Sequence, residues 1–102
     1  MISKLQEKNE KSRKVLYETA KNMAHNLIID NILTQPLPRI KELLASYAEN
    51  YKKINEFIDM SAEDMIDWYN DHCQLIPDSA IKRDAKIISD SILSHFLTEM
   101  CE

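Results

Sequence analysis

Histidine and cysteine are the residues of this 102-residue chain whose chemistry suits metal binding or nucleophilic catalysis. The three histidines are His25, His72 and His95, and Cys73 follows His72 directly. Zinc sites are recognised in sequences by ligands paired a few residues apart, as in HxxxH or CxxC. The sequence contains neither pattern. We therefore expect no metal site and no cofactor.

Nucleophilic and nucleotide-dependent catalysis are also disfavoured. Neighbouring side chains on a helix point about 100° apart, so His72 is not placed to activate Cys73. The chain has no glycine, whereas average usage of about 7% would give roughly seven. Phosphate-binding loops, dinucleotide-binding turns and the nucleophile elbow of hydrolases all require glycine. The sequence thus predicts a protein that is not an enzyme and has no catalytic residues.

The same absence of glycine indicates the fold class, because tight hairpin turns between strands depend on glycine. Apolar residues recur at helical spacing, and prolines at positions 36, 38 and 77 mark boundaries. Helices are predicted over about residues 3–33, 38–58, 61–76 and 78–100. Their short connections favour antiparallel neighbours. The predicted fold is all-α, an antiparallel bundle of about four helices whose first helix is overlong and basic.

The second and third predicted helices carry most of the aromatic residues. The second has apolar residues spaced alternately four and three positions apart: Ile40, Leu44, Tyr47, Tyr51, Ile54 and Ile58. This spacing is typical of a helix packed along its neighbours. Ser61 is expected to cap the third helix. Its inner face would carry Met65, Trp68, Tyr69 and His72. Tyr47, Tyr51 and Trp68 fit a core or an interface equally well.

The first predicted helix changes character along its length. Residues 6–14 include no apolar residue, whereas apolar residues recur at helical spacing from residue 15 onward. We expect residues 1–14 to form a polar, basic extension that projects from the bundle or frays. Residues 15–102 would form a single helical-bundle domain. The candidate functional residues of the extension are Ile2, Lys4, Leu5, Lys8, Lys11 and Arg13.

These residues suggest two kinds of contact for the extension. Ile2 and Leu5 lie far from the chain's own core and would support a homo-dimer. The basic side chains could follow the phosphates of a nucleic acid. Glu7 and Glu10 interrupt the basic residues and make nucleic acid the weaker candidate.

Acidic residues gather in the third predicted helix. Residues 54–81 hold no lysine or arginine, and helical spacing puts four acidic residues on the outer face: Glu63, Asp64, Asp67 and Asp71. A solvated helix face explains such a cluster most simply. The alternative is an electrostatic docking surface for a protein partner with a basic surface, to which Trp68 adds apolar contact.

Two functions are compatible with these features. The first is a non-enzymatic protein–protein interaction module, such as an adaptor, chaperone, inhibitor or immunity-type protein, that binds its partner through the acidic face. The second is a homo-oligomeric nucleic-acid-associated or transcription-regulating protein that uses the basic N-terminal helix. The net charge of −4, the lack of paired cysteines and a longest aliphatic run of only Leu27–Ile29 predict a cytoplasmic protein without a membrane segment.

Overall fold

A computed structural model gives the structure of the chain and describes residues 4–100. Four α-helices account for most of this range: α1 (Lys4–Leu33), α2 (Leu37–Glu49), α3 (Tyr51–Asp71) and α4 (Asp78–Met100). No strand occurs within it. The predicted all-α bundle of about four helices is confirmed.

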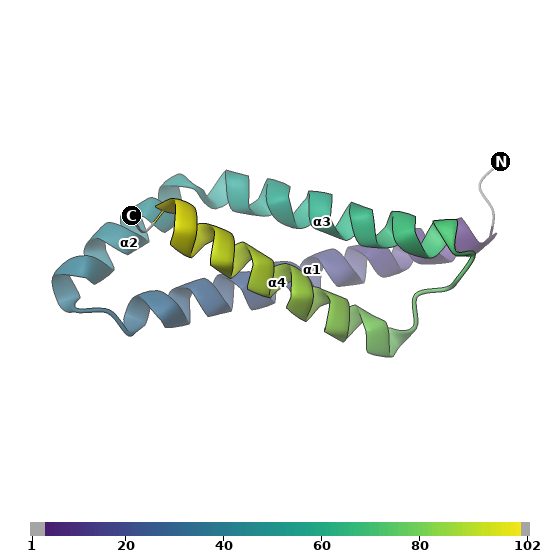
Figure 1. The fold of residues 1–102 in the computed structure, drawn as a ribbon, viewed down its shortest axis with the longest axis horizontal. Helices are drawn as coiled ribbons and strands as arrows, with labels where there is room; N and C mark the ends of the chain where they lie inside the picture. The colour runs from purple at the N-terminus through teal and green to yellow at the C-terminus, as the bar shows by residue number, and fades with distance from the viewer. Residues whose placement is uncertain (1–3, 101–102) are drawn as a thin grey trace.

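The helices form a long, narrow bundle with principal extents of 53 × 23 × 17 Å. Figure 1 shows α1 running from one end of the molecule to the other, α2 and α3 leading back one after the other, and α4 returning beside them. The 30 residues of α1 correspond to about 45 Å of helix. The prediction of antiparallel neighbours holds for α1 against α3 and for α3 against α4. It is wrong for α2 and α3, which together form one leg of the bundle.

The hydrophobic core lies along α1, which contacts all three other helices and packs most extensively on α4. The buried residues of α1 and α4 include several with short side chains, among them Ala20, Ala24, Ala85 and Ser89. Short side chains at these positions let two helix backbones approach closely. Larger residues such as Leu16, Ile28, Ile58, Ile88 and Phe96 fill the remaining interior.

The sequence predicted a break near residue 60. In the structure the break between α2 and α3 falls at Asn50. The backbone N–H of Asn50 donates to the Ser46 carbonyl at 3.0 Å, and its side-chain Nδ2 donates to the same oxygen at 2.8 Å. A side chain that competes for a helical carbonyl bends the helix at that point. Ser61 consequently lies inside α3, so its predicted role as an N-cap is wrong.

The C-terminus of α3 is formed without glycine or proline. The N–H of Cys73 donates to the Asn70 carbonyl at 3.1 Å, and the N–H of Gln74 donates to the Tyr69 carbonyl at 3.0 Å. These two bonds define a Schellman motif, in which the residue after the cap usually is glycine in the left-handed region. Here Cys73 takes that place with φ 52. The prediction that Pro77 ends this helix is therefore wrong.

Replacing Cys73 with glycine is expected to raise the free energy of unfolding by about 1 kcal/mol, because glycine has no Cβ to clash in the left-handed conformation. Urea denaturation measures the change. A Cys73→Ala variant, which keeps the Cβ and loses the thiol, serves as the control and should match the wild type. Equal stability of the glycine and alanine variants would show that the positive φ costs the fold nothing.

Candidate functional site

Acidic side chains of α3 form the most distinctive surface of the bundle. This acidic surface consists of Glu63, Asp64, Asp67 and Asp71, all of them exposed. Within residues 4–100, Asp64, Asp67 and Asp71 make no ion pair. Their charges are therefore available to an approaching molecule.

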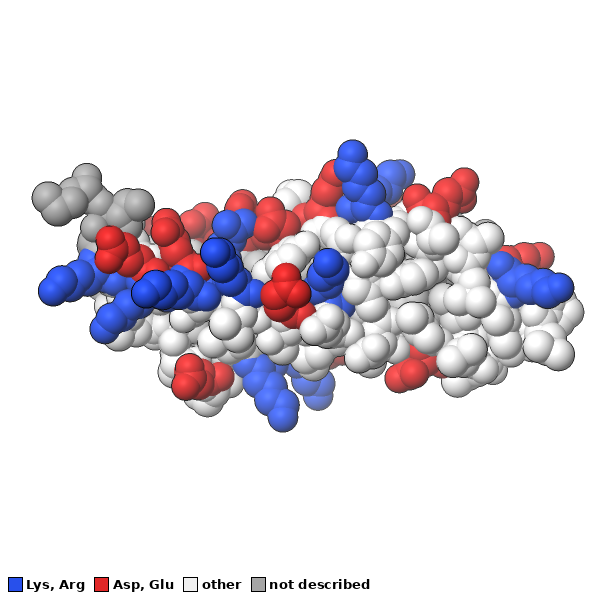
Figure 2. Space-filling view, turned by 180° about the vertical axis from the view of Figure 1, so that it is seen from behind, with Lys and Arg blue, Asp and Glu red and all other residues white. Residues whose placement is uncertain are grey.

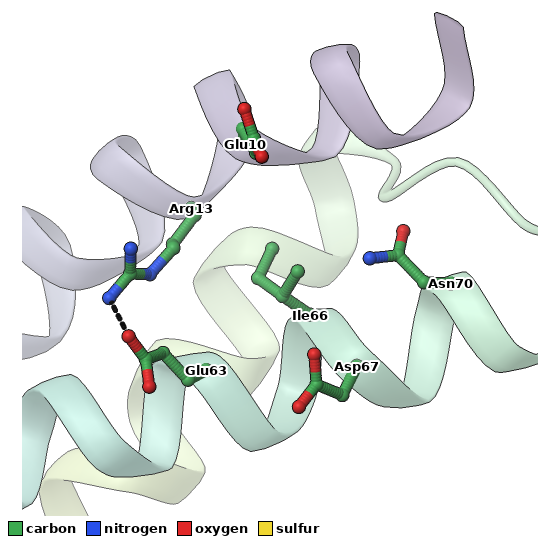
Figure 3. Close-up of a pocket in the computed structure, with 6 residues that line it drawn as sticks. All are labelled: Glu10, Arg13, Glu63, Ile66, Asp67 and Asn70. Carbon is green, nitrogen blue, oxygen red and sulfur yellow. Dashed lines mark hydrogen bonds and ion pairs between the residues drawn. The ribbon is translucent and has the colours of Figure 1, made fainter. Parts of the chain in front are cut away.

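Arg13 of α1 crosses to this surface. Its Nη2 donates to Asp59 Oδ1 at 2.7 Å. It also donates to Glu63 Oε1, the pair drawn in Figure 3. These partly exposed pairs are each worth less than about 1 kcal/mol to stability. Arg13 was predicted to belong to a free basic extension, but it pairs with acidic residues of α3 in its own chain.

Asn9 fixes the same part of α1 to the end of α3. It is fully buried. Its Nδ2 donates to Asn70 Oδ1 at 3.0 Å and to the Gln74 carbonyl at 3.1 Å, and its Oδ1 accepts from the Ile76 N–H at 3.0 Å. The expectation that residues 1–14 project or fray is wrong for the described part of that stretch, because residues 4–14 belong to a continuous, docked helix.

The other residues of the predicted arm do not form a separate basic surface. Lys4, Lys8 and Lys11 are exposed, Leu5 is half-buried, and Ile2 lies outside the described residues. Figure 2 shows lysine and arginine side chains interleaved with acidic ones at this end of the molecule. A shallow hollow there is lined by Glu7, Glu10, Lys11 and Lys14, two side chains of each sign.

A second hollow lies between α1 and α3, beside the Arg13 ion pair (Figure 3). It has a volume of about 210 Å³ and is lined by Glu10, Arg13, Glu63, Ile66, Asp67 and Asn70. Three carboxylates and one guanidinium line the hollow, so it carries a net negative charge. An organic cation such as a lysine or arginine side chain matches that charge. Sequence reasoning missed Glu10, which joins the acidic surface only because the two helices pack here.

Trp68 lies on the other flank of α3 and is 50% exposed. Its ring stacks on His72 with centroids 4.1 Å apart, and it meets Tyr69 edge-on at 5.1 Å. The prediction that Trp68 and His72 face inward is wrong, because α4 packs mainly on α1 and leaves this flank of α3 uncovered. Trp68 lines a hollow of about 480 Å³ together with Tyr69, Gln74, Leu75, Pro77 and Arg83.

A polar network forms one wall of the Trp68 hollow. The Tyr69 hydroxyl donates to Asp84 Oδ2 at 3.2 Å and accepts from Arg83 Nη2 at 3.0 Å, while Arg83 Nε donates to Asp84 Oδ1 at 3.2 Å. Burial raises the pKa of Tyr69, and the neighbouring Asp84 carboxylate raises it further. The network holds the Arg83 guanidinium at the rim and connects α3 to α4.

His25 is the most enclosed of the three histidines, between α1, α2 and α3. Its Nε2 lies 3.3 Å from Asn55 Oδ1, its Nδ1 is hydrogen-bonded to the Tyr47 hydroxyl, and its ring stacks on Tyr51. Burial lowers the pKa of His25 and outweighs the opposing effect of the Asn55 hydrogen bond. The neutral ring, with its proton on Nε2, satisfies both neighbours at once. His25 therefore has a structural role.

The described helices contain no group of three or more histidine, cysteine or acidic side chains placed to hold a metal ion. None of α1 to α4 is long and apolar enough to cross a membrane. No protein family, curated protein or solved structure matches the chain. The structure thus defines a class, an all-α helical bundle with an acidic surface on one helix.

Proposed function

We propose that this protein is a non-enzymatic interaction module that binds a basic segment of a protein partner on the acidic surface of α3. One observation carries the proposal. Asp64, Asp67 and Asp71 are exposed side by side on one helix and have no ion-pair partner among residues 4–100. Such a surface would suit an adaptor, chaperone, inhibitor or immunity-type protein.

The two hollows suggest how the partner is held. A lysine or arginine of the partner enters the hollow between α1 and α3, which carboxylates from both helices line. An apolar side chain of the same partner rests against Trp68 and Leu75 in the Trp68 hollow. Exposed aromatic residues of this kind supply much of the binding energy at interfaces, while charges steer the approach. Binding of this type weakens as salt is added.

The alternative of a nucleic-acid-associated regulator has less support. It requires a basic N-terminal helix with free cationic side chains. Arg13 is paired with Asp59 and Glu63, and the remaining lysines alternate with acidic residues along α1. Sustained phosphate contact needs an uninterrupted basic surface.

A charge-reversal pull-down tests the proposed function. The triple variant Asp64→Lys, Asp67→Lys, Asp71→Lys is compared with the wild type by quantitative mass spectrometry of proteins captured from cells that express the chain natively. The captured partner is expected to fall about tenfold or more, and to fall in the same way for the wild type at high salt.

The matched control reverses three exposed acidic residues elsewhere, in the variant Glu18→Lys, Asp30→Lys, Asp90→Lys. Its net charge equals that of the first variant, so a nonspecific charge effect would lower capture in both. Equal loss in the two variants, or retention of every partner by the first, would overturn the proposal.

A further inference from the structure

The Trp68 hollow combines apolar walls with a single charged residue. It lies where the chain passes from α3 to α4, at one end of the bundle (Figure 1). Trp68 is 50% exposed and Leu75 is 51% exposed, so both side chains are open to a ligand. Of the described residues that line the hollow, only Arg83 is charged. Its volume of about 480 Å³ falls within the range of roughly 300–1,000 Å³ that is typical of small-ligand sites.

Arg83 is held in a fixed orientation by two buried side chains. Its Nε donates to Asp84 Oδ1 at 3.2 Å, and its Nη2 donates to the Tyr69 hydroxyl at 3.0 Å. The side chain of Asp84 is 5% exposed, whereas that of Arg83 is 66% exposed. Within residues 4–100, Nη1 has no hydrogen-bond partner. The inner edge of the guanidinium is therefore occupied, and the outer edge, formed by Nη1 and Nη2, is available to a ligand.

A carboxylate fits this outer edge. Planar guanidinium groups bind carboxylates through two parallel N–H···O bonds, and a guanidinium that is already fixed loses less freedom on binding. Asp84 offsets much of the Arg83 charge, which makes contact with a lone anion weak. The apolar walls have to supply the remaining affinity, because burial of an apolar group against them is favourable.

We propose that the Trp68 hollow binds the last residue of a polypeptide, with its α-carboxylate on Arg83 and its apolar side chain against Trp68 and Leu75. Within a polypeptide, only the C-terminal residue carries a carboxylate and an apolar side chain on the same carbon atom. One residue thus satisfies both features of the hollow. Capture of a C-terminal carboxylate is a recurring mode of peptide recognition. An internal aspartate or glutamate brings the carboxylate without the apolar group.

The identity of the occupant rests on the proposed function, since the apolar side chain that the partner places against Trp68 then belongs to the partner's last residue. The basic residues of the same segment precede it and reach the acidic surface of α3. The hollow can nevertheless be tested by itself, because Asp64, Asp67 and Asp71 do not line it.

Fluorescence of Trp68 tests the site directly, since the chain contains one tryptophan. The full chain is titrated at neutral pH and constant ionic strength with N-acetyl-leucine, which carries the α-carboxylate and an apolar side chain. N-acetyl-leucinamide keeps the side chain without the charge, and acetate keeps the charge without the side chain. N-acetyl-leucine is expected to give a saturable change with a dissociation constant on the order of 1 mM. Both other probes should bind at least about tenfold more weakly.

Two substitutions locate the binding groups. Arg83→Gln should weaken the binding of N-acetyl-leucine about tenfold or more, because it removes the guanidinium edge. Leu75→Ala should weaken it about threefold or more through lost apolar contact, and Leu75 lies exposed outside the helices and the core. Arg39→Gln in α2 is the matched control, since Arg39 also pairs with an acidic residue and lies outside the hollow. It should leave the affinity unchanged. Circular dichroism confirms that each variant is folded.

Three results would overturn the proposal. The first is the absence of saturable binding of N-acetyl-leucine. The second is equal affinity for N-acetyl-leucinamide or for acetate, which would show that the carboxylate or the apolar side chain is not recognised. The third is unchanged affinity in Arg83→Gln or Leu75→Ala, or an equal loss in Arg39→Gln.

The same titration separates this site from the acidic surface. The variant Asp64→Lys, Asp67→Lys, Asp71→Lys should bind N-acetyl-leucine at least as tightly as the wild type, because it leaves the lining of the hollow intact. Failure of the hollow and failure of the proposed function are therefore distinguishable.

Discussion

Replacing Asn9 with alanine is expected to lower the free energy of unfolding by about 3 kcal/mol. Asn9 is fully buried and makes three hydrogen bonds to residues beyond position 69. Alanine removes all three and leaves the buried N–H of Ile76 without a partner. An unsatisfied buried donor costs about 1–3 kcal/mol, in addition to the loss of the other bonds. Urea denaturation followed by circular dichroism measures the change.

Asn26→Ala is the matched control, because Asn26 is exposed in the same helix. Its side chain makes no hydrogen bond to any residue within 4–100. Its stability should equal or slightly exceed that of the wild type, since alanine favours the helix. Asn9→Asp should destabilise at least as much as Asn9→Ala, because a carboxylate cannot donate to the Gln74 carbonyl. An Asn9→Ala variant as stable as the wild type would mean that the N-terminal third of α1 is not docked.

The sequence predicted the bounds of the first and last helices almost to the residue. Expected helices over 3–33 and 78–100 correspond to α1 (Lys4–Leu33) and α4 (Asp78–Met100). Long apolar periodicity and the prolines at 36 and 77 mark these boundaries. Asn50 and Cys73 were missed for a different reason. Cys73 takes a left-handed conformation that glycine usually supplies, and Asn50 interrupts the helix with its side-chain hydrogen bond to the Ser46 carbonyl. Nothing in the spacing of their neighbours reveals either.

The candidate site was predictable only within one helix. Helical spacing alone puts Glu63, Asp64, Asp67 and Asp71 on the outside of α3, where the structure has them. The ion pairs of Arg13 join residues 46 and 50 positions apart in sequence. Such contacts depend on the register between two helices, which charge patterning does not set. Asn9 gave no signal, because one buried amide in a polar stretch looks like any solvated residue.

The neighbouring leucines of α2 show how the missed break affected the predicted core. The predicted seam ran through Leu44 and Tyr51, as if one straight helix continued to residue 58. In the structure Leu43 is 4% exposed while Leu44 is 41% exposed. Asn50 is half-buried and follows Leu43 by seven residues and precedes Ile54 by four. Because it is polar, it interrupts the apolar periodicity between these two buried residues. Ile40 and Tyr47 of the predicted apolar positions still pack against the core, whereas Leu44 does not, and Leu43 at the edge of the predicted face takes the buried place.

Leu43→Ala is accordingly expected to lower the free energy of unfolding by about 3 kcal/mol, in the range for a buried leucine. Leu44→Ala, one residue away, should cost less than about 1 kcal/mol because its side chain is already partly solvated. A Leu44→Ala variant that loses as much stability as Leu43→Ala would contradict this difference in burial.

The location of the loss is as informative as its size. Leu43 is the sole buried residue of α2, so its truncation leaves only partly buried side chains, Ile40 and Tyr47, to hold this helix to the core. Amide hydrogen exchange should therefore accelerate in α2 before it does in α3 or α4, since local unfolding begins where buried apolar contact is least. Equal acceleration in all four helices would show that α2 unfolds only with the whole bundle.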